Sequence, residues 1–174
     1  MSNKPGLVNQ PIDPTHPSSQ ALRTALGRFS TGVTLATCVD AAGQRTGLTA
    51  NSFSALSLKP ALVLWSLRKA SPSLAAFRGA PHFAINVLAE DQVDLSRRFA
   101  SPVQDKFTHG EWRAGLHGLP VLAGCIAVFE CIAHAMHDAG DHMLFIGQVL
   151  RVSEHAAPPL LFQGGHYRTM GRAL

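Results

Sequence analysis

Apolar residues recur at every second position in several stretches of the chain, and this period constrains the fold more than any other feature. It is clearest in segments 33–38 and 126–136, and segment 143–153 is expected to be a further strand. Side chains of a β-strand point alternately to its two faces, so this period predicts strands that are buried on one face. Shorter segments of similar composition bring the expected total to six to eight strands: 46–56, 82–88 and 160–167.

One further strand is expected from a different pattern. Residues 61–67 form an almost continuous apolar run, which predicts a central strand that is buried on both faces. The polar segment 40–44 contains a glycine and an aspartate, and it predicts a hairpin turn between the two strands that flank it.

Helices are expected to be few and short. Apolar residues at helical spacing predict helices over 18–29, 71–79 and 91–99, with Ser71 and Asp91 as N-caps of the last two. Strands outnumber helices and do not alternate with them regularly, which argues against a doubly wound parallel sheet. The sequence therefore predicts a mainly β, mostly antiparallel protein that forms a closed or partly closed β-barrel.

The chain has 174 residues, which fits a single domain with a sizeable core. Residues 1–17 are polar and contain four prolines, so we expect an extended arm there and one domain over 18–174. Glycine and proline in segment 101–120 predict a long irregular connection, which is often functional in a compact domain. Charged residues make up 15% of the chain, a low share that suggests a surface covered in an oligomer.

Several classes of function are disfavoured. The net charge is +4, but the cations are scattered, so no nucleic-acid site is expected. No apolar stretch has the length of a signal peptide or a membrane span. Cys38, Cys125 and Cys131 form no Cys-x-x-Cys pair, and the histidines show no metal-binding spacing, so no metal site is expected. An odd cysteine number without a signal peptide predicts a cytoplasmic protein.

Common catalytic and nucleotide motifs are also missing. The sequence has no Gly-x-Gly-x-x-Gly after a strand, no phosphate-binding Gly-x-x-x-x-Gly-Lys-Ser/Thr loop and no Gly-x-Ser-x-Gly elbow. Four weaker segments are therefore the candidates for function: 47–54, 66–73, 140–149 and 161–168.

The first two segments are suited to a flat, phosphate-bearing ligand. Small residues in 47–54 let such a ligand approach the backbone, and hydroxyls there can bond to its polar parts. Segment 66–73 runs past two cations, Arg68 and Lys69, into an expected helix start, where a phosphate would be favoured. The alternatives are an ordinary exposed strand for the first segment and a capped helix with solvated cations for the second.

The last two segments each contain a histidine. His142 at the start of a strand is a candidate acid–base group or ligand donor, and its alternative is a histidine in a solvated turn. In 161–168 a double glycine precedes Tyr167 and Arg168. That segment predicts either a turn before a final strand or a cover for a ligand.

Taken in order, these segments resemble the flavin reductase-like family. The resemblance covers about residues 20–170 and rests on an ordered set of short matches: 28–33, 47–54, 57–63, Ser71, 83–88, 105–107, 140–142 with Gly147 and Val149, and 167–168. It implies an FMN-binding split β-barrel that binds FMN or FAD. Of the segments discussed, only the proline-rich arm lies outside it.

The resemblance also implies the roles of individual residues. The strand facing the flavin, with backbone contacts to the ring and hydroxyl contacts to its tail, would comprise Thr49, Ala50, Asn51 and Ser52. The second flavin-binding segment, at the ribityl and phosphate groups, would comprise Ser66, Leu67, Lys69 and Ser71.

Four more residues are implied around the ring. His142 matches the family histidine near the nicotinamide, and Tyr167 is expected to line the same pocket. Lys106 and Phe107 lie in a segment that, in a family homodimer, could close over the ring.

The implied reaction is hydride transfer from NADH or NADPH to the flavin, in an NAD(P)H:flavin oxidoreductase that supplies a separate monooxygenase. Stacking of the nicotinamide on the flavin needs no dinucleotide fold, which agrees with the missing glycine motif. Three alternatives stay open: a flavin-carrying electron-transfer protein on the same barrel, an enzyme like pyridoxamine-phosphate oxidase, and a non-catalytic flavin-binding module. The sequence leaves the choices between FMN and FAD, and between NADH and NADPH, undecided.

Overall fold

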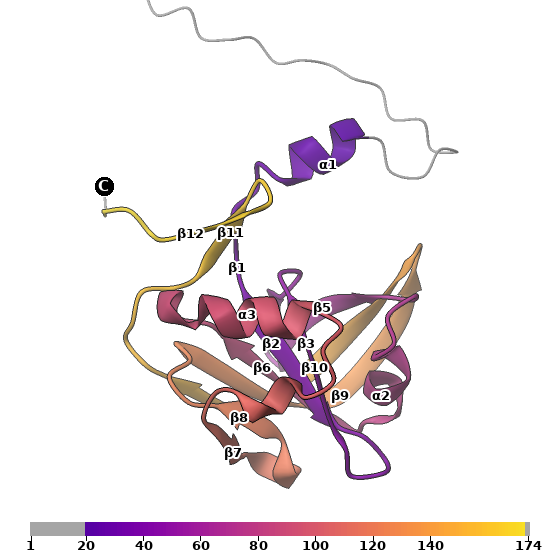
Figure 1. The fold of residues 1–174 in the computed structure, drawn as a ribbon. Helices are drawn as coiled ribbons and strands as arrows, with labels where there is room; N and C mark the ends of the chain where they lie inside the picture. The colour runs from indigo at the N-terminus through magenta and orange to yellow at the C-terminus, as the bar shows by residue number, and fades with distance from the viewer. Residues whose placement is uncertain (1–19, 173–174) are drawn as a thin grey trace, which may run out of the picture.

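A computed structural model describes residues 20–172, and within them twelve strands, three α-helices and three short 3₁₀-helices (Figure 1). The helices are α1 (Gln20–Leu26), α2 (Leu74–Gly79), η1 (Glu90–Gln92), α3 (Val93–Ala100), η2 (Lys106–Thr108) and η3 (Leu116–Gly118). The strands are β1 (Thr31–Gly32), β2 (Thr34–Val39), β3 (Arg45–Ala50), β4 (Ser54–Leu58), β5 (Ala61–Arg68), β6 (His82–Val87), β7 (Trp112–Ala114), β8 (Pro120–Leu122), β9 (Ala127–Ala139), β10 (His142–Glu154), β11 (Leu161–Gln163) and β12 (His166–Arg168). The predicted arm over 1–17 lies outside the described residues.

Seven strands form one antiparallel sheet in the order β3-β2-β6-β9-β10-β5-β4. Its two outermost strands, β3 and β4, follow each other in the chain and are joined by residues 51–53 alone. Three residues cannot cross the width of a flat seven-stranded sheet, because neighbouring strands lie about 4.8 Å apart. The sheet therefore has to curl until its two edges meet.

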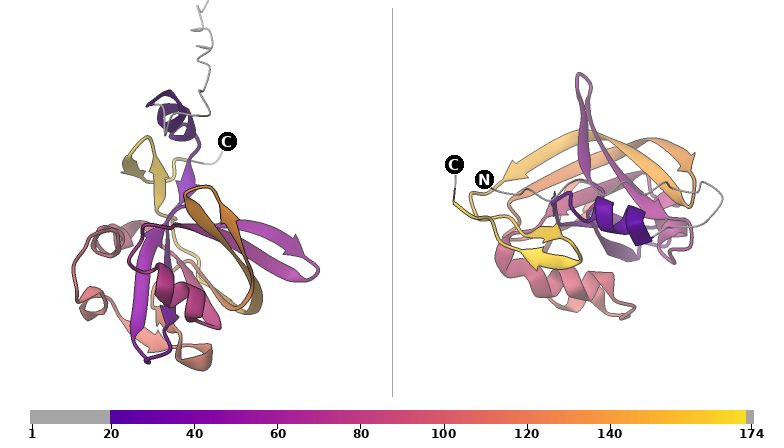
Figure 2. Two further views of the ribbon diagram at one scale, coloured as in Figure 1. Left: turned by 90° about the vertical axis from the view of Figure 1, so that its right-hand side faces the viewer. Right: turned by 90° about the horizontal axis from the view of Figure 1, so that it is seen from above.

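The side chain of Ser52 joins this link to β5, the neighbour of the edge strand β4. Its hydroxyl donates to the carbonyl of Ser66 on β5 and accepts from the N–H of the same residue, both at 3.0 Å. We call residues 51–53, with this contact, the seam of the barrel. Figure 2 shows the curved sheet below α1 and the β11–β12 hairpin, which stand away from it.

Two apolar clusters lie on opposite faces of the sheet. In the first, Trp65 stacks on Phe145 at a ring distance of 4.8 Å, and Phe77 of α2 meets its edge at 4.9 Å. The second lies under α3 and centres on Leu35, Leu88 and Phe99. The predicted fold class is confirmed: the protein is mainly β and antiparallel, with few short helices.

A buried amide joins the barrel to the short β7–β8 hairpin. Asn86 on β6 is fully buried. It donates to the carbonyl of Leu35 and the hydroxyl of Thr37, each at 3.2 Å, and accepts from the N–H of Leu122 at 2.9 Å. All three bonds are shielded from water, so each would be costly to lose.

Some expected elements differ in detail. Segment 46–56 is not one strand, because the seam at 51–53 divides it into β3 and β4. Segment 61–67 is not buried on both faces: β5 is next to the edge strand β4, and only Val63, Trp65 and Leu67 point into the core. Segment 160–167 forms a hairpin of two strands, β11 and β12.

The helix boundaries also differ from those expected. α1 ends at Leu26, and α2 begins at Leu74 after a turn at Ser71. Asp91 caps no helix, because η1 precedes α3 and the side chain of Gln92 instead accepts the N–H of Ala89 at 3.0 Å. Between residues 20 and 172, no helix is long and apolar enough to cross a membrane.

Replacing Asn86 with alanine is expected to lower the free energy of unfolding by about 3 kcal/mol, because three buried partners lose their hydrogen bonds. Urea denaturation followed by Trp fluorescence measures this change. Asn51→Ala is the matched control, since Asn51 is exposed and should change stability by less than about 0.5 kcal/mol. Equal stabilities of the two variants would contradict the structural role of Asn86.

Candidate functional site

A cleft of about 1320 Å³ lies along the seam of the barrel. Its floor is β3, one end wall is the turn from β5 into α2, and the opposite wall is the end of α3 with segment 100–107. His142 at the start of β10 lies at its mouth. The volume exceeds the roughly 300–1,000 Å³ of a pocket for one small molecule, so there is room for more than one ring system.

The cleft brings together most of the residues singled out from the sequence. Those that line it are Thr49, Ala50, Asn51, Ser52, Ser66, Leu67, Ser71, Lys106, Phe107 and His142. They come from four separate parts of the chain, and the curl of the sheet brings them into one place.

Two expected site residues lie elsewhere. The Lys69 Nζ pairs with Asp138 Oδ1 at 2.7 Å, and its backbone N–H donates to the carbonyl of Asp141 at 2.9 Å, so Lys69 holds the β9–β10 hairpin instead of lining the cleft. Its neighbour Arg68 lines the cleft. Tyr167 lies outside the cleft and packs against α3, where its hydroxyl is 2.9 Å from that of the buried Ser96.

The hydroxyl groups of the cleft fall into two kinds. Thr49 donates its proton to the carbonyl of Ser96 at 2.6 Å, and Ser52 donates its own to Ser66. A hydroxyl has one proton, so neither residue can also donate to a ligand phosphate. In contrast, no described group accepts the hydroxyl proton of Ser66, Ser71 or Ser73. The expected hydroxyl contacts therefore shift from β3 to the turn that follows β5.

β3 offers a different kind of binding group. It is the terminal strand of the sheet and pairs only with β2 among the described strands. Alternate backbone N–H and C=O groups on its other edge are therefore free of strand partners and are available to a ligand with its own donors and acceptors. This supports the expectation of backbone contacts along Thr49, Ala50, Asn51 and Ser52.

His142 is oriented by the residue before it. Its Nδ1 lies 2.7 Å from Asp141 Oδ1, and because a carboxylate only accepts, Nδ1 carries the proton. This contact holds the pKa of Asp141 below its usual range. The other ring nitrogen, Nε2, is left for an interaction with a ligand.

Segment 100–107 is fixed in place as a wall of the cleft. The Lys106 Nζ donates to the carbonyl of Phe99 at 2.9 Å, and Arg98 donates to the carbonyls of Asp105 and Lys106. Burial lowers the pKa of Lys106. The ring of Phe107 meets Phe99 edge-on at 5.1 Å, so both predicted residues of this segment are held by internal contacts.

Sequence reasoning missed several lining residues at the start of β3 and in the facing wall, including Arg45, Thr46, Phe99 and Gln104. Arg45 lies with its guanidinium carbon 5.0 Å from the ring centre of Phe107. No local motif marks these residues, because contacts between distant segments bring them to the cleft.

A second hollow, of about 610 Å³, lies beside β7 and β9. The carboxylate of Glu130, which is almost fully buried, pairs there with the Arg151 guanidinium at 2.5 and 2.9 Å. The two charges satisfy each other, which indicates a structural ion pair. Among the described residues, no group of three or more His, Cys, Asp or Glu side chains is arranged to hold a metal ion.

The three cysteines are buried thiols whose reactive thiolate form is disfavoured. Burial raises the pKa of Cys38, Cys125 and Cys131 to about 12 each. At neutral pH all three are protonated, and a thiol in that state is a poor nucleophile.

Comparison with known proteins gives a consistent result. The sequence model of one family, described as "Flavin reductase like domain", matches residues 26–171. The chain is 44% identical over 155 residues to "FMN reductase (NADH) SmoA" of Agrobacterium fabrum, covering 89% of this chain and 88% of that protein. It is 42% identical to "Flavin-dependent monooxygenase, reductase subunit HsaB" of Rhodococcus jostii, covering 92% and 80%.

The solved structures to which the chain is similar also include flavin reductases. The NADH:FAD oxidoreductase SgcE6 of Streptomyces globisporus, in complex with NAD and FAD fragments, superposes with a TM-score of 0.85 at 34% identity, covering 94% of this chain and 98% of that chain. Three further relatives are longer, and the chain spans between 48% and 64% of their length.

The packing of the cleft wall leads to a prediction at Gly47. A Cβ there would lie 2.7 Å from the ring of Phe99 and 3.2 Å from that of Phe107. Gly47→Ala is therefore expected to lower the free energy of unfolding by about 1–3 kcal/mol, because the rings have to move. Gly32→Ala in β1, where nothing lies within 4 Å, is the control. Thermal unfolding compares the two, and an unchanged melting temperature for Gly47→Ala would contradict this packing.

Proposed function

Because the chain belongs to the flavin reductase-like family, we propose that it is an oxidoreductase that reduces FMN or FAD with NADH or NADPH. The observation that carries the proposal is the cleft along the seam, where a free strand edge, three uncommitted serine hydroxyls and His142 converge. The names of both SmoA and SgcE6 give NADH as the donor, which favours NADH here.

The residues of the cleft fit a flavin. A flavin ring is flat and has alternating donors and acceptors along one edge, which matches the free edge of β3 next to Ala50 and Asn51. Its tail is anionic and rich in hydroxyls, which matches Ser71, Ser73 and the cation Arg68 at the end of β5. When bound, the flavin would supply the hydride-accepting chemistry.

The chain itself would bind, orient and shield the reactants. Asp141 holds the ring of His142 with Nε2 available at the mouth of the cleft. Nε2 donates a hydrogen bond to the nicotinamide if it carries a proton and accepts one if it does not. The fixed wall of Phe99, Lys106 and Phe107 keeps water from one side of the cleft. Holding two flat reactants in contact accounts for much of the rate enhancement in such a reaction.

The wider role follows from the relatives. HsaB is named as the reductase subunit of a flavin-dependent monooxygenase, and we propose that this chain likewise supplies reduced flavin to a separate monooxygenase component. The low share of charged residues, 15%, supports a homodimer, in which Lys106 and Phe107 would lie near the flavin ring. We propose a cytoplasmic location, because the proposed reaction consumes NADH, which the cytoplasm supplies.

Oxidation of NADH and NADPH by the purified protein, with and without FMN, FAD or riboflavin, tests the proposal. We expect NADH consumption that depends on added flavin, because a diffusible product has to be released and replaced. A protein that holds yellow flavin but consumes neither nucleotide would contradict the reductase and favour an electron carrier. A protein that binds no flavin would contradict both.

Replacing His142 is expected to impair this reaction. His142→Ala removes the oriented ring at the mouth of the cleft. The value of kcat/KM for NADH should therefore fall by about 10- to 100-fold. His137→Ala on the neighbouring β9 is the matched control, since that exposed histidine lies outside the cleft. Equal kinetics of the two variants would remove His142 from the reaction.

A further inference from the structure

We propose that the second hollow, beside β7 and β9, is a binding site for a small organic carboxylate with an apolar body. No described residue lines both this hollow and the cleft along the seam, so the two are separate. The volume of about 610 Å³ lies within the roughly 300–1,000 Å³ of pockets that hold small molecules. The proposal goes beyond the proposed function and does not depend on it.

One arginine of the hollow is oriented in advance by a buried carboxylate. Glu130 accepts from Nε and Nη2 of Arg151 at 2.5 and 2.9 Å, and its Oε2 also accepts the N–H of Leu116 at 2.5 Å. These bonds leave Nη1 and one N–H of Nη2 of Arg151 without a partner among the described residues, and its side chain is 47% exposed. Because the guanidinium is already fixed, an anion that binds these donors costs it little conformational entropy.

A second arginine, Arg113 on β7, also lines the hollow and is fully uncommitted. Its guanidinium makes no hydrogen bond or ion pair with a described residue. Burial raises the pKa of the Cys125 thiol, and the positive charge of Arg113 is among the smaller influences that lower it, so the guanidinium lies near this lining residue. Two guanidinium groups in one hollow can grip a carboxylate through their paired N–H donors.

The floor between these arginines is apolar. It is formed by four buried side chains that belong to the cluster under α3: Val121, Leu122, Cys125 and Val128. Because they are part of the core, this floor is already formed without a ligand. An apolar body that lies on it is removed from water, which favours an organic anion over an inorganic one.

One group of the hollow opposes an anion. The charge of Glu130 is neutralised by its partners, but Glu154 is exposed and has no ion-pair partner among the described residues. Solvent screens an exposed charge, so its repulsion should weaken binding without preventing it. This gives the site a signature of its own, because loss of Glu154 and loss of Arg113 should change the affinity in opposite directions.

The hollow also lies behind the wall of the seam cleft. Successive residues of a strand point to opposite faces, and while Arg113 lines the hollow, the ring of Trp112 lies 5.4 Å from that of Phe99 and 4.9 Å from that of Phe107. Both phenylalanines line the cleft. A carboxylate at Arg113 would therefore contact the hairpin that supports this wall.

Calorimetric titration of the full chain with benzoate tests the site. Benzamide has the same shape without the charge, and acetate has the charge without the apolar body, so these two are the matched probes. We expect a dissociation constant below about 1 mM for benzoate. Both other probes should bind at least about tenfold more weakly, because each lacks one of the two kinds of contact.

Two variants test the residues. Arg113→Ala should weaken benzoate binding about tenfold, as for loss of a charge-assisted hydrogen bond, and its exposed position without described partners means that the fold is retained. Glu154→Gln should strengthen binding about twofold. Arg151 is left unchanged, because its loss would leave the buried charge of Glu130 unpaired and destabilise the protein.

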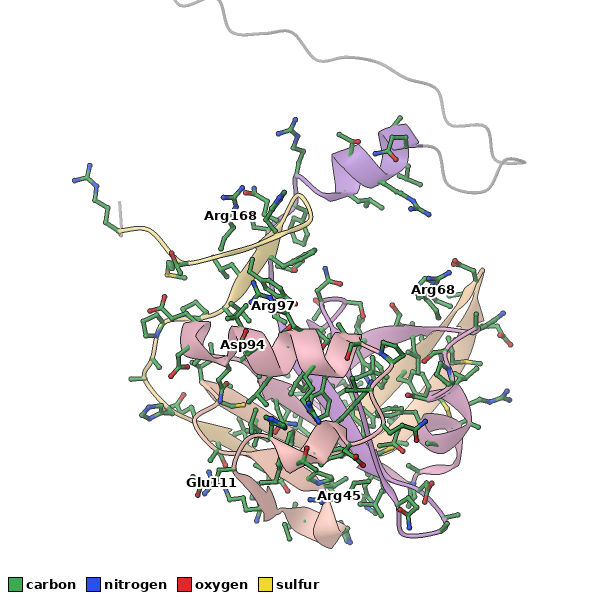
Figure 3. All side chains as sticks on the ribbon, viewed as in Figure 1. Arg45, Arg68, Asp94, Arg97, Glu111 and Arg168 are labelled. Carbon is green, nitrogen blue, oxygen red and sulfur yellow. The ribbon has the colours of Figure 1, made fainter. Side chains whose placement is uncertain are left out.

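Two further variants are the controls. Arg68→Ala removes a cation of the seam cleft, and Arg168→Ala removes an exposed cation of β12. Figure 3 shows both in the upper part of the molecule, away from Glu111, which directly precedes β7. Neither should change the affinity for benzoate. No binding of benzoate, equal binding of benzamide, or weaker binding in Arg68→Ala with none in Arg113→Ala would overturn the site.

Discussion

The barrel and its cleft both depend on the three residues that join β3 to β4. These two strands are the outer edges of one seven-stranded sheet, so a link this short forces the sheet to curl until the edges meet. The hydroxyl of Ser52 then forms two hydrogen bonds with the backbone of Ser66, in place of the ladder that full closure would give. The barrel is closed by the chain and one side chain, and β3 keeps a free edge beside the seam.

That incomplete closure accounts for the chemistry of the cleft. A fully paired β3 would have no backbone groups to offer, whereas an edge strand presents them in alternation to a flat ligand. The hydroxyls divide accordingly. Thr49 and Ser52 hold α3 and β5 against the strand, and the serines after β5 keep their protons for a ligand. Structural and binding roles are thus separated between neighbouring residues of similar type.

Much of this could be predicted from local patterns, and the rest depends on distant contacts. The period of two identified the strands at 33–38 and 126–136, and residues 47–52 of the small-residue segment 47–54 line the cleft. The break at the seam was missed, because strand-like composition continues across residues 51–53. Tyr167 was expected in the cleft, yet it bonds to Ser96, a residue 71 positions away. Arg45 was missed for the same reason, since its partner Phe107 lies on another segment.

A crystal structure of the protein with bound FMN tests the central claim most directly. The account predicts that the flavin ring lies along the free edge of β3 at Ala50 and Asn51, with its phosphate at Ser71 and Ser73. In that structure Ser52 should still bond to the backbone of Ser66. A flavin bound in the hollow beside Glu130 and Arg151, or one that displaces the Ser52 contact to enter the barrel, would contradict it.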